Sequence, residues 1–207
     1  MIGGGAPGGG REAGPVMREE VMVPAADDML TLGRRLAAVL LPGDLVVLSG
    51  DLGAGKTTLV QGIGAGLGVR GPITSPTFVI ARVHPSLGGG PPLVHADAYR
   101  LGSPAEVDDL DLDASLETSV TVVEWGGGLV EGLAPDRLDV SIALARPAPG
   151  PGPEGVPGGP APDNGPGPEH EPRTVRLEGH GARWEGVGLP PPGRVPAPGS
   201  VGEIASN

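Results

Sequence analysis

The sequence predicts an α/β fold in which helices flank a single central, mainly parallel β-sheet. Nearly continuous apolar runs of strand length, at residues 44–50 and 119–126, indicate buried strands. Segments of helical period, at residues 26–40 and 56–69, lie between such runs, and this alternation is typical of α/β proteins. A glycine-rich loop joins the first apolar run to the second helical segment, as in a nucleotide-binding strand–loop–helix unit.

The first elements are a short strand at residues 18–24 and the helix at residues 26–40. Asp27 and Asp28 lie at the start of this helix, where carboxylates stabilise the exposed N–H groups and the positive end of the dipole. A Pro-Gly pair then ends the helix. The apolar run at 44–50 follows as a buried strand.

The chain continues to alternate after the second helix. The segment 136–145 alternates apolar and polar residues, which indicates an edge or half-buried strand. The other expected elements are, in order, a loop and strand at 74–84, a strand with its exit at 93–101, an acidic helical region at 104–118, the buried strand at 119–126 and a last strand and turn at 173–186.

The glycine-rich loop has the spacing of a phosphate-binding loop. Its sequence, GDLGAGKT at residues 50–57, matches G-x4-G-K-[ST], and it contains the only lysine of the chain. Glycines let the backbone wrap around phosphates, Lys56 supplies a compact cation, and Thr57 offers a hydroxyl to Mg²⁺. We therefore expect a P-loop NTPase-like fold, in which the phosphate-binding residues are Asp51, Leu52, Gly53, Ala54, Gly55, Lys56, Thr57 and Thr58.

Two carboxylates follow apolar strand runs and complete the predicted site. Asp97 follows one run and Glu124 another, and the carboxyl ends of parallel strands meet at one edge of a sheet. Asp97 is expected to hold a metal-bound water, and Glu124 to ligate the metal or orient the attacking water. Either residue taken alone is more typical of a surface carboxylate. Ser75 and Thr77, in a Ser-Pro-Thr turn, are candidate switch residues that sense the terminal phosphate, although such a sequence is also typical of a simple turn.

Glycine and proline mark the segments expected to be disordered. The chain contains 39 Gly and 26 Pro in 207 residues, and segments rich in both bury too little apolar surface to offset the cost of ordering. The predicted organisation is a disordered tail at 1–17, a P-loop domain at 18–146, a disordered insertion at 147–172, the last strand of the domain at 173–186, and a disordered tail at 187–207.

Charge and composition exclude several classes of protein. The net charge of −11 argues against strong direct binding of nucleic acid, which relies on clustered Lys and Arg. The absence of cysteine excludes disulfides and thiolate chemistry. No apolar run approaches the ~20 residues of a membrane span, and the N-terminus lacks the apolar core of a signal peptide. We expect a cytoplasmic protein.

Four motifs together resemble the TsaE family, the small ATPases of bacterial tRNA threonylcarbamoyladenosine synthesis. They are GDLGAGKTTLVQG, SPTF, HADAYRL and VEWG, and the resemblance covers residues 22–145 and extends to 173–185. It implies an ATPase that uses ATP and Mg²⁺ and works with the TsaD–TsaB pair. Those partners modify the adenosine beside the anticodon, so tRNA is contacted indirectly.

The resemblance also implies roles for individual residues. Lys56, Asp97 and Glu124 carry the catalytic function, and Thr57 and Glu124 are the metal ligands. Trp125 packs near the nucleotide, and Arg173 reaches toward it from the start of the last strand. In the motif HADAYRL, His95 is expected to be a satisfied buried histidine, whereas Tyr99 and Arg100 are structural or face a partner.

Two alternative functions use the same loop. A small phosphotransferase should carry a lid with paired arginines for its second substrate, whereas the arginines here are scattered. A nucleotide-sensing adaptor would bind its partners when loaded with ATP and hydrolyse little. The sequence favours the partner-stimulated ATPase over both.

Overall fold

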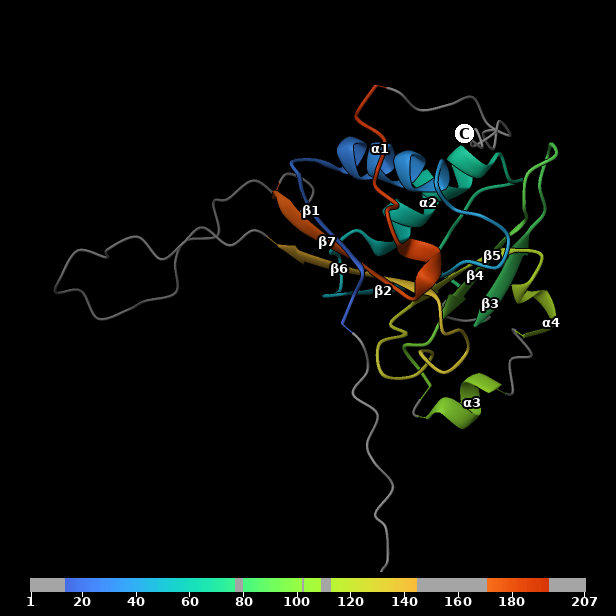
Figure 1. The fold of residues 1–207 in the computed structure, drawn as a ribbon. Helices are drawn as coiled ribbons and strands as arrows, with labels where there is room; N and C mark the ends of the chain where they lie inside the picture. Colours follow the sequence, from blue (N-terminus) through green and yellow to red (C-terminus); the bar gives the residue numbers. More distant parts are fainter. Residues whose placement is uncertain (1–13, 77–79, 102, 109–112, 145–170, 194–207) are drawn as a thin grey trace, which may run out of the picture.

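The structure is a computed structural model that describes residues 14–76, 80–101, 103–108, 113–144 and 171–193. A mixed β-sheet runs through its centre, with helices on both faces (Figure 1). The strands are β1 (Met17–Val23), β2 (Leu45–Gly50), β3 (Ala81–His84), β4 (Leu93–Asp97), β5 (Val120–Glu124), β6 (Arg137–Leu144) and β7 (Arg173–His180). The helices are α1 (Ala26–Ala37), α2 (Lys56–Leu67), α3 (Pro104–Asp108) and α4 (Asp113–Leu116), and a short 3-10 helix spans Ala182–Trp184.

The centre of the sheet is parallel and its edges are antiparallel. The seven described strands follow the order β1-β7-β6-β2-β5-β4-β3. Strands β6, β2, β5 and β4 pair in parallel, while β7 and β1 on one side and β3 on the other pair antiparallel. The predicted α/β fold with a mainly parallel central sheet is therefore confirmed, and the carboxyl ends of β2, β4 and β5 lie along one edge.

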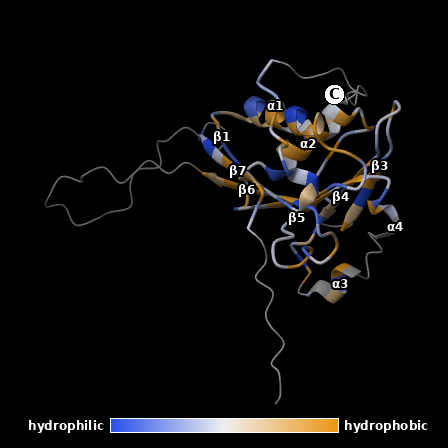
Figure 2. Cartoon of the chain, viewed as in Figure 1, coloured by the Kyte–Doolittle hydropathy of each residue, from blue (hydrophilic) through white to orange (hydrophobic). Residues whose placement is uncertain are grey.

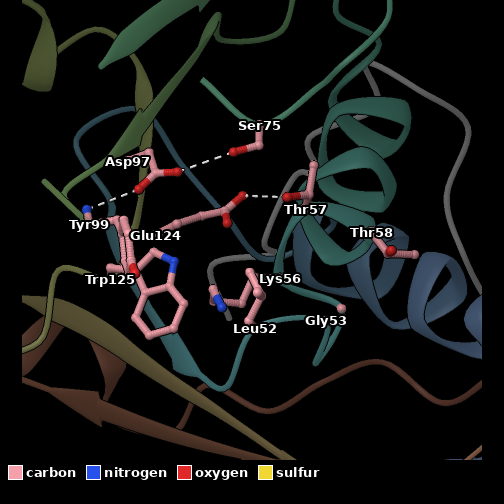
Figure 3. Close-up of a pocket in the computed structure, with 11 residues that line it drawn as sticks. Leu52, Gly53, Lys56, Thr57, Thr58, Ser75, Asp97, Tyr99, Glu124 and Trp125 are labelled. Atoms are coloured by element: carbon pink, nitrogen blue, oxygen red, sulfur yellow. Dashed lines mark hydrogen bonds between the residues drawn. The ribbon is translucent and has the colours of Figure 1, made fainter. Parts of the chain in front are cut away.

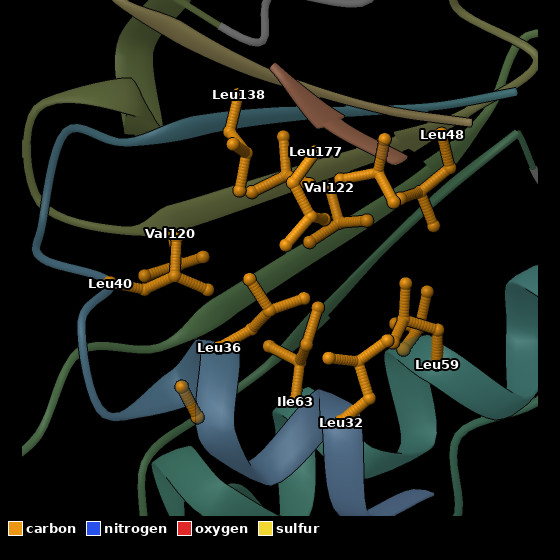
Figure 4. Packing of buried hydrophobic residues seen from close by; sticks show 14 of the residues in the cluster. Leu32, Leu36, Leu40, Leu48, Leu59, Ile63, Val120, Val122, Leu138 and Leu177 are labelled. Atoms are coloured by element: carbon orange, nitrogen blue, oxygen red, sulfur yellow. The ribbon is translucent and has the colours of Figure 1, made fainter. Parts of the chain in front are cut away.

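The face of the sheet under α1 and α2 carries the larger hydrophobic core. Leu32 and Leu36 of α1 and Leu59 and Ile63 of α2 point toward the strands, as Figure 4 shows. Apolar strand residues face these helices along the sheet, whereas polar residues of α1 face outward (Figure 2). At the start of α1, Asp28 Oδ2 accepts a hydrogen bond from the backbone N–H of Ala25 at 3.1 Å. This contact is one way in which an acidic side chain stabilises the helix end, as the sequence predicted.

The opposite face has a smaller core, built on the central strands. Val47 of β2, Val94 of β4 and Val123 of β5 pack there with Val107 of α3 and Val130. Because both faces of β2 and β5 are covered, every residue of β5 is buried, which explains the continuous apolar runs of the sequence.

The structure refines several predicted boundaries. β6 is half-buried as expected, but it is not an edge strand, because β7 and β1 continue the sheet beyond it. The predicted helical region at 104–118 contains the two short helices α3 and α4, with residues 109–112 outside the described part. The predicted insertion at 147–172 lies almost wholly outside the described residues.

Part of the predicted C-terminal tail is instead packed against the domain. Val187 and Leu189 contact the larger core. The Leu189 N–H donates to Glu19 Oε1 at 2.9 Å, and Arg35 Nε donates to the carbonyl of Pro190 at 2.6 Å. A low-complexity composition therefore did not prevent these residues from burying apolar side chains.

None of the helices in the described part of the chain has the length and apolar character that a membrane span requires.

Candidate nucleotide-binding site

The glycine-rich loop connects β2 directly to α2, as the sequence predicts. β2 ends at Gly50 and α2 begins at Lys56. Gly55, immediately before the helix, has a φ of 108°, a conformation that residues with a side chain rarely adopt. The first N–H groups of α2 have no partner within the helix and point out of its N-terminus, which makes this end a natural binding site for an anion.

A pocket of about 420 Å³ opens at the mouth of this loop (Figure 3). Its residues come from the loop, the start of α2, the segment before β3, and the ends of β4 and β5. Ten of the residues predicted from the sequence line it, namely Leu52, Gly53, Gly55, Lys56, Thr57, Thr58, Ser75, Asp97, Glu124 and Trp125.

The two predicted carboxylates lie side by side at the carboxyl edge of the sheet. Asp97 ends β4, Glu124 ends β5, and the two residues are paired in the parallel ladder. Both are buried, with 4% and 3% of their surface exposed. Asp97 accepts hydrogen bonds from the Ser75 hydroxyl at 3.1 Å and from the Tyr99 N–H at 2.9 Å. Strand register thus brings together two acids that are distant in the sequence.

Glu124 is also connected to the phosphate loop. The Thr57 hydroxyl donates to Glu124 Oε1 at 2.9 Å. A hydroxyl and a carboxylate at this separation offer two hard oxygen ligands to a small divalent cation. Among the described residues, no cluster of three or more His, Cys, Asp or Glu side chains could hold a metal.

Lys56 is buried in the pocket and held by its own loop. Its Nζ donates to the carbonyls of Gly50 at 2.8 Å and Asp51 at 3.0 Å. The same atom lies 3.7 Å from the centroid of the Trp125 ring, a cation–π contact. Burial lowers the pKa of Lys56, and the charges of Glu124 and Asp97 oppose this effect. A buried ammonium beside two carboxylates is suited to bind phosphate oxygens.

Trp125 and Tyr99 form an aromatic wall of the pocket. Their ring centroids are 5.2 Å apart at an interplanar angle of 59°. Trp125 has a φ of 60°, unusual for a residue with a side chain, and its N–H donates to the carbonyl of Leu48 at 2.8 Å. The sequence interpretation placed Tyr99 as a structural or partner-facing residue and did not include it in the site. Its position two residues after Asp97 was the available signal.

Three described site residues predicted from the sequence do not line this pocket, and a fourth predicted residue lies outside the described part of the chain. Asp51 and Ala54 belong to the loop but are absent from its lining. Thr77 lies outside the described residues. Arg173 starts β7, which β6 separates from β2, and its Nη1 donates to the carbonyl of Glu171 at 2.8 Å. Arg173 is not among the described residues that line the pocket, and its contact with the nucleotide stays a prediction.

His95 touches the site from behind, which the sequence interpretation did not anticipate. It was expected to be a satisfied buried histidine, and it is fully buried. Its Nε2 lies 2.9 Å from Glu124 Oε1, whereas its Nδ1 has no hydrogen-bond partner among the described residues. Only strand pairing reveals this contact, because β4 and β5 are separated in the sequence by α3 and α4.

Comparisons with known proteins find relatives of this chain. The family model for threonylcarbamoyl adenosine biosynthesis protein TsaE matches residues 23–148. The tRNA threonylcarbamoyladenosine biosynthesis protein TsaE of Streptomyces coelicolor is 70% identical over 118 residues, which cover 56% of this chain and 80% of that protein. The protein of the same name from Bacillus subtilis is 38% identical over 120 residues, covering 58% and 73% of the two chains.

A solved structure shares the fold. The crystal structure of Bacillus subtilis YdiB superposes with a TM-score of 0.59 and 26% sequence identity, and the match covers 82% of this chain and 90% of that chain. The match of the family model to most of the described domain decides the classification. This chain belongs to the TsaE family of threonylcarbamoyl adenosine biosynthesis proteins.

Proposed function

We propose that this chain is a Mg²⁺-dependent ATPase that supports tRNA threonylcarbamoyladenosine synthesis together with the TsaD–TsaB pair. The observation that carries the proposal is the convergence of Lys56, Thr57, Asp97 and Glu124 in one pocket at the N-terminus of α2. A phosphate loop alone binds phosphate. Two carboxylates beside it add the means to hold a metal and to orient a water for hydrolysis.

Each residue has a role that follows from its position. Lys56 exchanges its two loop carbonyls for phosphate oxygens, which are stronger acceptors because they are charged. Thr57 and Glu124 supply oxygen ligands for Mg²⁺, which would neutralise charge on the terminal phosphates. Asp97, held by Ser75 and the Tyr99 N–H, faces the same space and orients water. Trp125 and Tyr99 line one side of this space.

The proposed partners follow from the family and from the charge of the chain. With a net charge of −11, this protein is poorly suited to grip tRNA by itself. A family whose members are named for a tRNA modification then needs other proteins to contact the tRNA. The TsaD–TsaB pair is the partner that we propose, with ATP hydrolysis allowing that assembly to turn over.

Calorimetry with Mg²⁺ and ATP tests the nucleotide site. Lys56→Ala should abolish tight binding, because its ammonium is the only basic side chain among the described residues that line the pocket. Arg176→Ala is the matched control, since it removes the same charge from an exposed position on β7. An ATP affinity that is equal in Lys56→Ala and in the unmodified protein would refute the assignment.

Phosphate release, measured with and without TsaD–TsaB, tests the enzymatic function and separates the alternatives. Hydrolysis that rises when the partners are added supports the proposal. Transfer of label from ATP to a small molecule would instead indicate a phosphotransferase. The described pocket lining contains no arginine, whereas a phosphotransferase should carry paired arginines for its second substrate. Partner binding that depends on ATP but occurs without turnover would indicate a nucleotide-sensing adaptor.

A further inference from the structure

His95 occupies a position from which it can control Glu124. It lies on β4 two residues before Asp97, so both side chains project from the same face of the strand. His95 Nε2 and the Thr57 hydroxyl both lie 2.9 Å from the same carboxylate oxygen, Glu124 Oε1. Glu124 is therefore held from two sides, by the phosphate loop and by the interior of the sheet.

The hydrogen-bond network assigns the direction of the histidine contact. A carboxylate that binds a metal is ionised and only accepts hydrogen bonds, so in the proposed site His95 donates from Nε2 to Glu124 Oε1. His95 Nδ1 has no partner among the described residues. A single proton on Nε2 is the arrangement that leaves no buried N–H group without an acceptor, and burying such a group is costly.

We propose that His95 is a positioning residue that fixes the Glu124 carboxylate for magnesium, and this inference rests on the proposed function. Thr57 would supply its hydroxyl oxygen to the metal, and its hydrogen bond alone would then have to hold Glu124 from the side of the loop. The contact of His95 would hold the same carboxylate from behind, independently of the loop. Its N–H also fixes which oxygen of Glu124 is engaged and directs the rest of the group toward the pocket.

His84 provides a matched control within the same fold. It too is a buried histidine, with 3% of its surface exposed, and it lies on β3 beside β4. Its Nδ1 lies 3.4 Å from the carbonyl of Arg70, and it does not line the pocket. Replacing His84 tests the loss of a buried histidine without loss of the Glu124 contact.

The experiment compares ATP affinity by calorimetry in excess Mg²⁺ and in EDTA. The dissociation constant of ATP in EDTA, divided by its dissociation constant in Mg²⁺, measures the contribution of the metal to binding. We expect His95→Leu to reduce this ratio by about 10–100-fold, the usual effect of removing a group that orients a metal ligand, while affinity in EDTA stays near that of the unmodified protein. His95→Gln retains an N–H donor and should restore most of the ratio. His84→Leu should leave the ratio unchanged.

Two further measurements make the inference falsifiable. In a Glu124→Gln background, His95→Leu should cause no additional loss of the ratio, because its effect passes through Glu124. Nitrogen NMR of the unmodified protein, with isotope-labelled histidine, should show the proton of His95 on Nε2. This measurement does not require any variant to fold. A proton on Nδ1 overturns the inference.

The outcomes also distinguish this inference from the proposed function. If the unmodified protein binds ATP equally in Mg²⁺ and in EDTA, the proposed magnesium site fails. If its affinity depends on Mg²⁺ and folded His95→Leu shows the same dependence, only the role of His95 is overturned. A ratio reduced equally by His95→Leu and His84→Leu likewise overturns it, since the effect would then reflect the loss of any buried histidine.

Discussion

Lys56 combines a stability cost with a binding function at the scale of a single residue. Lys56 as a whole has 5% of its surface exposed, and burial lowers its pKa below the ordinary value of 10.5. A lowered pKa means that the charge is less favourable here than in water, despite the nearby carboxylates. A loss of stability from burying this charge is consistent with a lysine whose role is to bind phosphate.

This cost predicts how stability depends on pH. In the range between the lowered pKa of folded Lys56 and 10.5, the unfolded chain binds the proton more tightly than the folded protein. Stability contributed by this group is therefore smallest at low pH and increases as pH rises through that range. Since the chain has one lysine, Lys56→Met removes the whole effect.

The measurement is the free energy of unfolding in urea, without nucleotide, at several pH values up to 10.5. The difference between the unmodified protein and Lys56→Met should change in favour of the unmodified protein as pH rises, while contributions from other groups cancel. A difference that is constant over the range, or that changes in the opposite direction, would show that burial does not disfavour the charge.

The remaining site residues show what sequence reasoning can and cannot reach. Lys56 and Thr57 were identifiable because a phosphate loop has fixed spacing, and Asp97 and Glu124 because each follows an apolar strand. His95 was not, since its contact with Glu124 depends on the register of β4 and β5, two paired strands that α3 and α4 separate in the sequence. Local sequence determines which elements form, whereas contacts across the sheet depend on strand order.

The packing of α1 on α2 is the decisive feature at the scale of elements. From the sequence, the glycines of α2 only weaken a helix. In the structure, a Cβ on Gly62 would lie 2.9 Å from the Cα of Gly33 in α1, and a Cβ on Gly33 would lie 2.7 Å from the Cα of Gly62. The glycines thus permit close contact of two backbones, and propensity alone could not reveal this.

Gly62→Ala is therefore expected to destabilise the protein even though alanine is the better helix former. The intrinsic gain of about 1 kcal/mol is outweighed by overpacking, which typically costs about 1–3 kcal/mol and here opposes rigid backbone. Urea unfolding measures the net effect. Because α2 begins at Lys56, displacement of the helix should also weaken ATP binding.

Ala65→Gly supplies the control for helix propensity. Ala65 is exposed on the same helix, so this change should cost about 1 kcal/mol with no effect on packing. If Gly62→Ala stabilised the protein by a similar amount, the two helices would be free to separate and the tight contact would have no energetic weight.

At the scale of the whole molecule, the domain is divided in sequence but continuous in space. Leu144 at the end of β6 pairs with Arg173 at the start of β7, although residues 145–172 intervene. The sequence predicted β7 as part of the domain, but it could not place β7 and β1 outside β6, because a long interruption hides the antiparallel pairing. Arg173 starts β7 beside the end of β6, at the same edge of the sheet as the phosphate loop, and its contact with the nucleotide stays a prediction.

The close approach of these strand ends predicts that the intervening segment is dispensable. Residues 145–172 can be replaced with a four-residue turn containing Asn-Gly, which suits an antiparallel hairpin. This replacement is equivalent to halving the length of the connection about three times. Each halving lowers the entropic cost of closing a flexible loop by about 0.6 kcal/mol, so stability to urea should rise by about 1–2 kcal/mol. The affinity for ATP should not change, because β6 and β7 contribute no residue to the described pocket lining.

Arg173→Ala in the full-length chain is the companion variant, and it should also bind ATP normally. Weaker binding in the shortened protein alone would assign a nucleotide contact to the replaced segment, whereas weaker binding in Arg173→Ala would return that residue to the site.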